Sequence, residues 1–101
     1  MNARSKGKRV ERLWRDQLNA AGFSGSYRNA QQSNGGVNGA GYNPDVACPA
    51  LPRLHSEVKG VEKLNVRQAM QQSIDDAGDK HVPIVAWKKN NQPWLVVMKA
   101  D

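Results

Sequence analysis

The spacing of two acids and one lysine constrains this chain more than any other feature of its sequence. Asp45 follows Pro44, and the triplet Glu57-Val58-Lys59 begins twelve residues later. Each group adjoins an apolar stretch of strand length. On a strand, the two-residue period puts Glu57 and Lys59 on one face and turns Val58 into the core. The pattern therefore favours a fold in which two strands bring these acids and the lysine together.

These residue types suit the metal-dependent hydrolysis of a phosphodiester. Asp45 and Glu57, helped by the backbone carbonyl of Val58, can hold one divalent cation through oxygen ligands, with water completing its shell. All-oxygen donors favour Mg²⁺, with Mn²⁺ as a substitute. The cation would polarise a phosphoryl oxygen and lower the pKa of a bound water, while Lys59 could orient that water and offset charge on the phosphate. The alternative interpretation is a solvated cluster of salt bridges.

The composition favours a nucleic acid as the partner. The chain has 101 residues, which suits one domain over 1–101, and a net charge of +6 with a pI near 9.8. A basic balance of this kind points to a polyanion, because each neutralised phosphate releases counterions. Ribosomal proteins and membrane-surface binders share this property, so charge supports a nuclease only together with the candidate metal site.

Cysteine usage and hydropathy indicate where the protein works. Cys48 is the only cysteine, so neither an intrachain disulfide nor a cysteine-based metal cluster can form, and we expect a buried free thiol. No apolar stretch has the length of a signal segment or a membrane span. We therefore expect no membrane association and a cytoplasmic place of action, encoded by a bacterial host or a phage.

Apolar periodicity predicts seven elements in the order αβββαββ. One helix runs from a cap at Ser5 to about Ala21, and a second over 66–77 lies between an Asn65 cap and Gly78. Strands are expected over 23–28, 44–48, 54–59, 82–88 and 94–99. The polar loop 29–43 either closes on DNA or is a flexible connector. The result is an α/β fold with a central mixed five-stranded sheet flanked by helices.

Helical spacing also predicts the faces that the two helices bury. The first would bury Val10, Trp14, Leu18 and Ala21, and the second Val66, Met70, Ile74 and Ala77. Trp87 and Trp94 are expected in the sheet's core or on a dimer surface, and not as a platform on which bases stack. His55 and His81 are expected to be structural, although His55 shares the face of Glu57 and could contact a phosphate or a water.

The order of these features resembles the PD-(D/E)XK nuclease superfamily, and within it the small Holliday-junction-resolvase-like endonucleases of archaeal and phage type. The shared features are a basic opening stretch (1–9), a helix that carries Glu11 and exits at Gly22-Phe23, a strand with Arg28, a flexible loop, and the strands with Asp45 and Glu57-Val58-Lys59. The resemblance covers nearly all of the chain. It implies a restriction-endonuclease-like core and a magnesium-dependent endonuclease.

The resemblance also implies further site residues. Glu11 would be an auxiliary acid that reaches the metal through water or completes its shell, the alternative being a solvated pair with Arg15. A glutamine of the second helix would lie near the active site, with Gln72 as first choice, Gln68 as second and Gln71 left open. Candidate contacts to DNA phosphates are Arg4, Lys6, Lys8, Arg9, Arg28, Lys88 and Lys89.

Three functions agree with these observations. The first is a magnesium-dependent DNA endonuclease acting on branched DNA as a homodimer. The second is a phage or mobile-element endonuclease acting on ordinary duplex or on flaps. The third is a non-catalytic nucleic-acid-binding module in which the acids and the lysine are incidental.

Overall fold

The computed structural model describes residues 3–29 and 43–101, with side chains from Lys6 onward, and contains the seven elements in the predicted order. The loop expected over 29–43 lies almost wholly outside the described residues. The elements are α1 (Ala3–Ala20), β1 (Tyr27–Arg28), β2 (Val46–Ala47), β3 (Leu54–Lys59), α2 (Val66–Ala77), β4 (Val82–Trp87) and β5 (Leu95–Met98).

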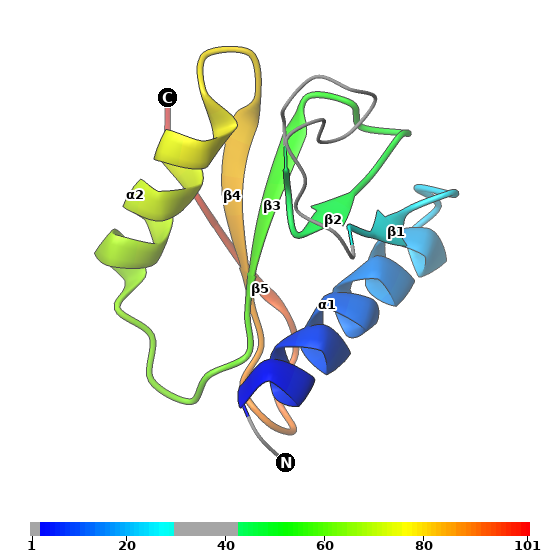
Figure 1. Ribbon diagram of the computed structural model, residues 1–101, viewed down its shortest axis with the longest axis vertical. Helices are drawn as coiled ribbons and strands as arrows, with labels where there is room; N and C mark the ends of the chain where they lie inside the picture. Colours follow the sequence, from blue (N-terminus) through cyan, green and yellow to red (C-terminus); the bar gives the residue numbers. More distant parts are fainter. Residues whose placement is uncertain (1–2, 30–42) are drawn as a thin grey trace.

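The strands form one mixed sheet in the order β1-β2-β3-β4-β5. Only β3 and β4 are parallel, because α2 forms the crossover between them, and the other neighbours are antiparallel. The two helices lie on opposite sides of the central strands (Figure 1). The prediction of a five-stranded mixed sheet flanked by helices is confirmed and is consistent with a restriction-endonuclease-like core. No helix of the described residues could cross a membrane.

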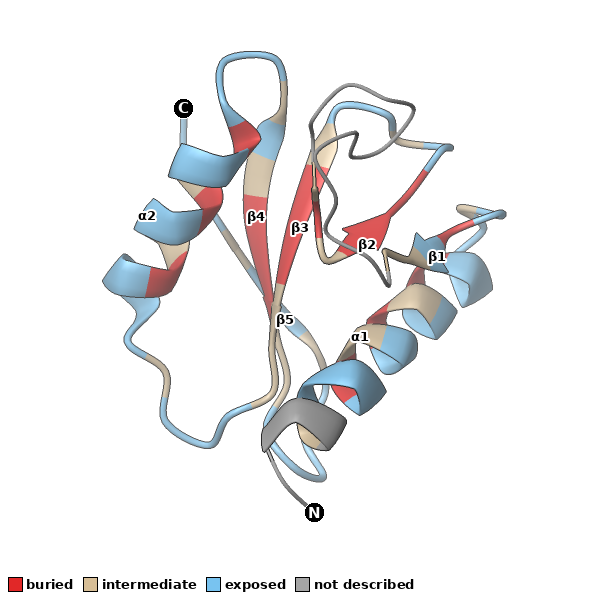
Figure 2. Cartoon of the chain, viewed as in Figure 1, coloured by how far each residue is buried: buried red, intermediate tan, exposed pale blue. Residues whose placement is uncertain are grey.

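The main core lies between α1 and the sheet. Trp14 and Leu18 of α1 pack on Val46, Ile84 and Ala86, which are buried on the central strands (Figure 2). The Trp14 indole N–H donates to the Ser56 hydroxyl at 3.1 Å, which satisfies a polar group in this core. Trp94 joins the same cluster with its ring centroid 4.9 Å from that of Trp14. Of the two positions predicted for Trp94, the core is therefore the one adopted, and Cys48 is buried there as expected.

The buried face of α2 differs from the prediction. Of the residues expected to face the core, Val66, Met70, Ile74 and Ala77, only Ala77 is buried. The helix instead turns its small residues Ala69 and Ser73 toward the sheet. The Ser73 hydroxyl donates to the carbonyl of Ile84 at 2.9 Å, so burying it leaves no polar group unsatisfied. Small side chains let α2 lie close to β4. This close packing outweighs the burial that the larger apolar residues one position further on, Met70 and Ile74, would have given.

Two predicted boundaries in the first third of the chain are wrong. Helix α1 begins at Ala3, so Ser5 lies inside the helix and is not its N-cap, and Ala21 lies beyond the helix and is exposed. The strand expected over 23–28 shrinks to its last two residues because the chain turns at Gly22 and Gly25, whose φ angles of 101° and 84° are ones that glycine adopts readily. The other boundaries agree within two residues.

The end of β3 approaches α1 so closely that only glycine fits there. A Cβ on Gly60 would overlap the side chain of Val10. We expect Gly60→Ala to destabilise the protein by about 1–3 kcal/mol, the usual cost of overpacking. Gly7→Ala is the control, because a Cβ there meets nothing within 4 Å and α1 should gain about 0.5–1 kcal/mol. Urea unfolding measures both, and equal stability of the two variants would contradict this packing.

Candidate active site

The two acids of the predicted motif meet where β2 pairs with β3. In the antiparallel register Val46 lies opposite Ser56, so Asp45, the residue before β2, lies opposite Glu57 of β3. The Asp45 N–H donates to the carbonyl of Ser56 at 3.1 Å, and the Asp45 carboxylate accepts the Val58 N–H at 2.8 Å. These bonds fix Asp45 against the second motif. The strand pairing therefore brings together side chains that are twelve residues apart in sequence.

The environment of Asp45 disfavours its ionised form. Burial, and then the nearby charge of Glu57, raise its pKa from 3.8 to about 7. Glu11 raises this pKa further, whereas the Val58 N–H and Lys59 act in the opposite direction. A divalent cation would remove the repulsion between the two carboxylates, and both offer hard oxygen donors. The residues present thus fit a metal of the magnesium class.

Lys59 lies on the side of β3 that carries α2. Its ammonium donates to the Gln72 side-chain carbonyl at 3.2 Å, and Lys59, Gln68 and Gln72 line a pocket of about 520 Å³. Gln71 instead donates to the Asp75 carboxylate at 2.9 Å. Of the three glutamines considered from sequence, the structure therefore brings Gln72 into contact with the lysine, places Gln68 in the same pocket and pairs Gln71 elsewhere.

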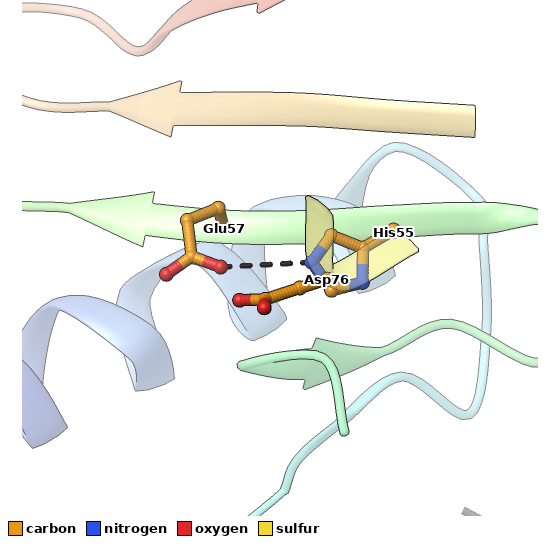
Figure 3. A group of neighbouring side chains, drawn as sticks. All are labelled: His55, Glu57 and Asp76. Carbon is orange, nitrogen blue, oxygen red and sulfur yellow. Dashed lines mark ion pairs between the residues drawn. The ribbon is translucent and has the colours of Figure 1, made fainter. Parts of the chain in front are cut away.

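Two further residues gather around Glu57. His55 is fully buried, and its Nε2 lies 3.5 Å from the Glu57 carboxylate (Figure 3). Asp76 of α2 completes the group, in which one donor atom of each residue lies within 4.8 Å of the others. From the sequence, His55 is expected to make at most a contact with a phosphate or a water, and Asp76 is not among the predicted site residues. Asp76 could have been found, because it follows Gln72 by four residues and so shares its stripe on the helix.

Glu11 and Arg28 form a salt bridge close to this centre. The Arg28 Nε donates to the Glu11 carboxylate at 2.7 Å, and the side chains are only 17% and 20% exposed respectively. The expected alternative partner of Glu11, Arg15, instead bonds to Asp16 at 2.9 Å. Glu11 is therefore neither solvated nor paired along its own helix. Arg28 is also a candidate DNA contact, and it uses one of its N–H donors for this salt bridge.

Four of the other basic candidates line one cleft of about 350 Å³: Lys6, Arg9, Lys88 and Lys89. Lys8 is exposed and does not line the cleft, and the side chain of Arg4 lies outside the described residues. His81, expected to be structural, has its Nδ1 3.1 Å from the carbonyl of Ala77 at the end of α2. The structure thus gathers most of the remaining predicted DNA contacts in one place.

One family of known proteins matches the chain. The family model described as "phage putative PDDEXK endonuclease" matches residues 2–101. No curated protein and no solved structure matches. The match spans almost the whole sequence, including Asp45 and the strand that carries Glu57 and Lys59.

The raised pKa of Asp45 predicts how the metal-free protein responds to pH. The folded state holds the Asp45 proton more tightly than the unfolded chain does. The contribution of Asp45 to stability should therefore be most favourable below about pH 4 and should fall as the pH rises to about 7. Asp45→Asn keeps an acceptor for the Val58 N–H and removes the charge. In EDTA at pH 8 we expect this variant to melt several degrees above the wild type.

A divalent cation should reverse the order of the two melting temperatures, so that the wild type melts above Asp45→Asn. Mg²⁺ should raise the melting temperature of the wild type and leave Asp45→Asn nearly unchanged, because binding to the folded state stabilises it. Asp75→Asn, a change at an exposed acid on α2, is the control. If Asp45→Asn lowers the melting temperature in EDTA, the carboxylate stabilises the fold rather than straining it.

Proposed function

The chain belongs to this family of phage PDDEXK endonucleases, and on that basis we propose that it is a magnesium-dependent DNA endonuclease centred on Asp45, Glu57 and Lys59. The observation that carries the proposal is the strand register, which holds the half-buried Asp45 carboxylate on the Val58 N–H at 2.8 Å, opposite Glu57. The raised pKa of Asp45, caused by burial and by Glu57, agrees with this placement. Two neighbouring acids in such a place cost stability unless a cation binds them. A catalytic role would explain why the chain carries both acids despite this cost in stability.

Asp45 and Glu57, with the backbone carbonyl of Val58, would hold the cation, Mg²⁺ with Mn²⁺ as a substitute. When bound, the metal supplies a polarised phosphoryl oxygen and a water of lowered pKa. The group His55, Glu57 and Asp76 offers a second donor set that shares Glu57. Its imidazole suits zinc, iron or nickel better than magnesium. Activity with Mg²⁺ and Mn²⁺ but not Zn²⁺ supports the all-oxygen set.

Lys59 would act on the attacking water and on the charge that develops on the phosphate. Its hydrogen bond to Gln72 orients the ammonium, which gives Gln72 a positioning role. Glu11, whose charge acts on Asp45, would be the auxiliary acid, and Arg28 keeps it in place. The basic candidates Arg4, Lys6, Lys8, Arg9, Arg28, Lys88 and Lys89 would contact DNA phosphates. Their contacts position the DNA and carry no base information.

We propose branched DNA as the substrate and a homodimer as the active form. The exposed apolar side chains on β5 support the dimer: Leu95, Val96 and Met98 are 55%, 48% and 57% exposed on an edge strand. An unpaired apolar edge is a natural site for pairing with a second copy. The alternatives remain an endonuclease for ordinary duplex or flaps, and a binding module without activity. A cytoplasmic place of action stays a prediction.

Cleavage of labelled four-way junction, flap and linear duplex, each with Mg²⁺, Mn²⁺ or EDTA, separates these functions. Metal-dependent cutting of the junction in preference to the others supports the proposal. Cutting of flaps or duplex alone supports the second function. If neither metal supports cleavage of any substrate, the binding module becomes the better explanation.

Removing either carboxylate should abolish cleavage without weakening DNA binding. Asp45→Asn and Glu57→Gln each weaken the cation and lessen the repulsion of phosphate, so binding should be unchanged or tighter. Product formation on gels and fluorescence anisotropy measure the two properties separately. Asp75→Asn is the matched control and should cut normally. Cleavage retained by Asp45→Asn or Glu57→Gln would remove that residue from the centre.

Lys59→Ala should lower the cleavage rate by at least about 100-fold, the loss seen when a group that stabilises the transition state is removed. Melting temperature and metal affinity should change little, because the Lys59–Gln72 bond is exposed. Lys63→Ala, at an exposed loop lysine, is the control. A collapse of stability in Lys59→Ala would mean instead that the lysine supports the fold.

The proposed dimer makes a separate prediction. The free protein should sediment as a dimer, and Met98→Lys should make it a monomer that stays folded, because the side chain is exposed on the edge strand. At fixed salt the dimer should bind a junction more tightly than duplex of equal length. A monomeric wild type without junction preference would remove the resolvase-like function and leave a general nuclease.

A further inference from the structure

The cleft that gathers the basic residues lies beyond the carboxyl ends of β3 and β4. Lys6 and Arg9 line it from the first half of α1, and Lys88 and Lys89 line it from the segment after β4. Gly60, the residue after β3, forms part of its wall. None of the described residues that line this cleft is acidic. The cleft is therefore a concentration of positive charge from parts of the chain about eighty residues apart.

The fold holds these cations together although they repel one another. The Lys88 N–H donates to the carbonyl of Lys59 at 3.0 Å and so continues the pairing of the two strands past their ends. The close contact between Gly60 and Val10 draws α1 against the same point. Like charges gathered in a concave site raise the local concentration of anions. A phosphate group is the anion that a DNA-cutting protein would meet there.

A second hollow, of about 590 Å³, adjoins the cleft and shares Lys89 and Asn90 with it. Trp87 lines this hollow, its indole N–H held by the carbonyl of Val61 at 2.7 Å. The ammonium of Lys89 lies 5.6 Å from the centre of the Trp87 ring. One acid, Glu62, also lines the hollow, but its carboxylate accepts the Asn90 N–H at 2.9 Å. An anchored, partly exposed aromatic ring thus stands next to a cluster of cations. The sequence alone gives no reason to expect base stacking on Trp87, and this setting is what suggests it.

The position of Trp87 connects the hollow with the candidate active site. In the parallel register Trp87 lies beside Lys59, so the two side chains share one face of the sheet. Gly60, the next residue, belongs to the wall of the basic cleft. A strand of nucleic acid that passes Lys59 would therefore meet Trp87 and then the cations at this end of the sheet.

We propose that the cleft and the Trp87 hollow together bind an unpaired strand of DNA, with phosphates held by Lys6, Arg9, Lys88 and Lys89 and a base stacked on Trp87. This inference rests on the proposed endonuclease function and specifies its substrate as DNA with a single-stranded segment. A base in a duplex is stacked on its neighbours and has no free face for the ring. Cationic grooves with aromatic side chains are the usual means of binding single strands.

The test measures binding of a labelled oligothymidylate and of a blunt duplex of equal length, in EDTA so that no cleavage occurs. The cleft variant is Lys6→Gln with Lys89→Gln. The control is Lys63→Gln with Lys80→Gln, which removes the same charge from exposed positions outside the cleft and the hollow. The cleft variant should bind the oligothymidylate at least about tenfold more weakly, and the slope of log affinity against log salt should fall by about 1.4. The control should stay within about twofold of the wild type.

Trp87 provides an independent readout, because Trp14 and Trp94 pack together in the core. Oligothymidylate should quench the fluorescence of the wild type, and Trp87→Phe should lose that quenching while keeping most of the affinity. Trp87→Leu should bind roughly tenfold more weakly, the effect of losing one stacked base. Circular dichroism of each variant checks that it is folded.

Two results would overturn the inference. The first is equal weakening by the cleft and control variants, which would mean that only net charge matters. The second is equal loss of duplex and single-strand affinity in the cleft variant, which would mean a general backbone contact. Neither depends on nuclease activity. If the wild type cuts DNA but the strand does not bind here, the inference fails alone. If no metal supports cleavage but the strand does bind here, the proposed function fails alone.

Discussion

The rest of the structure depends on β3, because this strand packs against a helix on each face and pairs with another strand along each edge. On one face Ser56 accepts the indole N–H of Trp14 in the main core, and on the other Glu57 and Lys59 face α2 and the candidate site. Its edges pair antiparallel with β2 and parallel with β4. A slip of one residue would put the two charged side chains into the tryptophan core. The register that buries Ser56 is thus also the register that assembles the site.

This arrangement explains why an unfavourable charge persists at Asp45. The Asp45 carboxylate bonds to the Val58 N–H, and so it is part of the contact between β2 and β3 as well as part of the acidic centre. Burial and the charge of Glu57 act against its ionisation and raise its pKa. The fold can bear one such position because the core on the far face of β3 is apolar and well packed. The stability lost at this position is offset by packing that takes no part in the proposed chemistry.

The placement of the strand residues of the candidate site could be predicted from sequence, because a period of two leaves no choice about which side chains of β3 share a face. The placement of the helix residues could not. Apolar spacing favoured Met70 and Ile74 for the buried face, whereas close packing selected Ala69 and Ser73. Once it is known which face α2 turns toward the sheet, the helix residues that meet β3 can be derived. Two residues of strand span about 6.6 Å and four residues of helix about 6 Å, so alternate residues of β3 meet Gln72 and Asp76 in turn. The basic cleft needed the tertiary fold, because α1 and the segment after β4 are far apart in the chain.

The two sides of the end of β3 carry opposite charge, and the backbone keeps them apart. Asp45 and Glu57 make one region attractive to cations, while Lys6, Arg9 and Lys88 make the cleft past Gly60 attractive to phosphates. If the two groups shared one surface they would pair with each other, and neither would be available to a ligand. Lys59 stands at the border, since its side chain faces α2 and its carbonyl accepts the Lys88 N–H. A polyanion bound in the basic cleft, as proposed, would thereby reach the edge of the acidic centre, where only a bound cation would let it approach further.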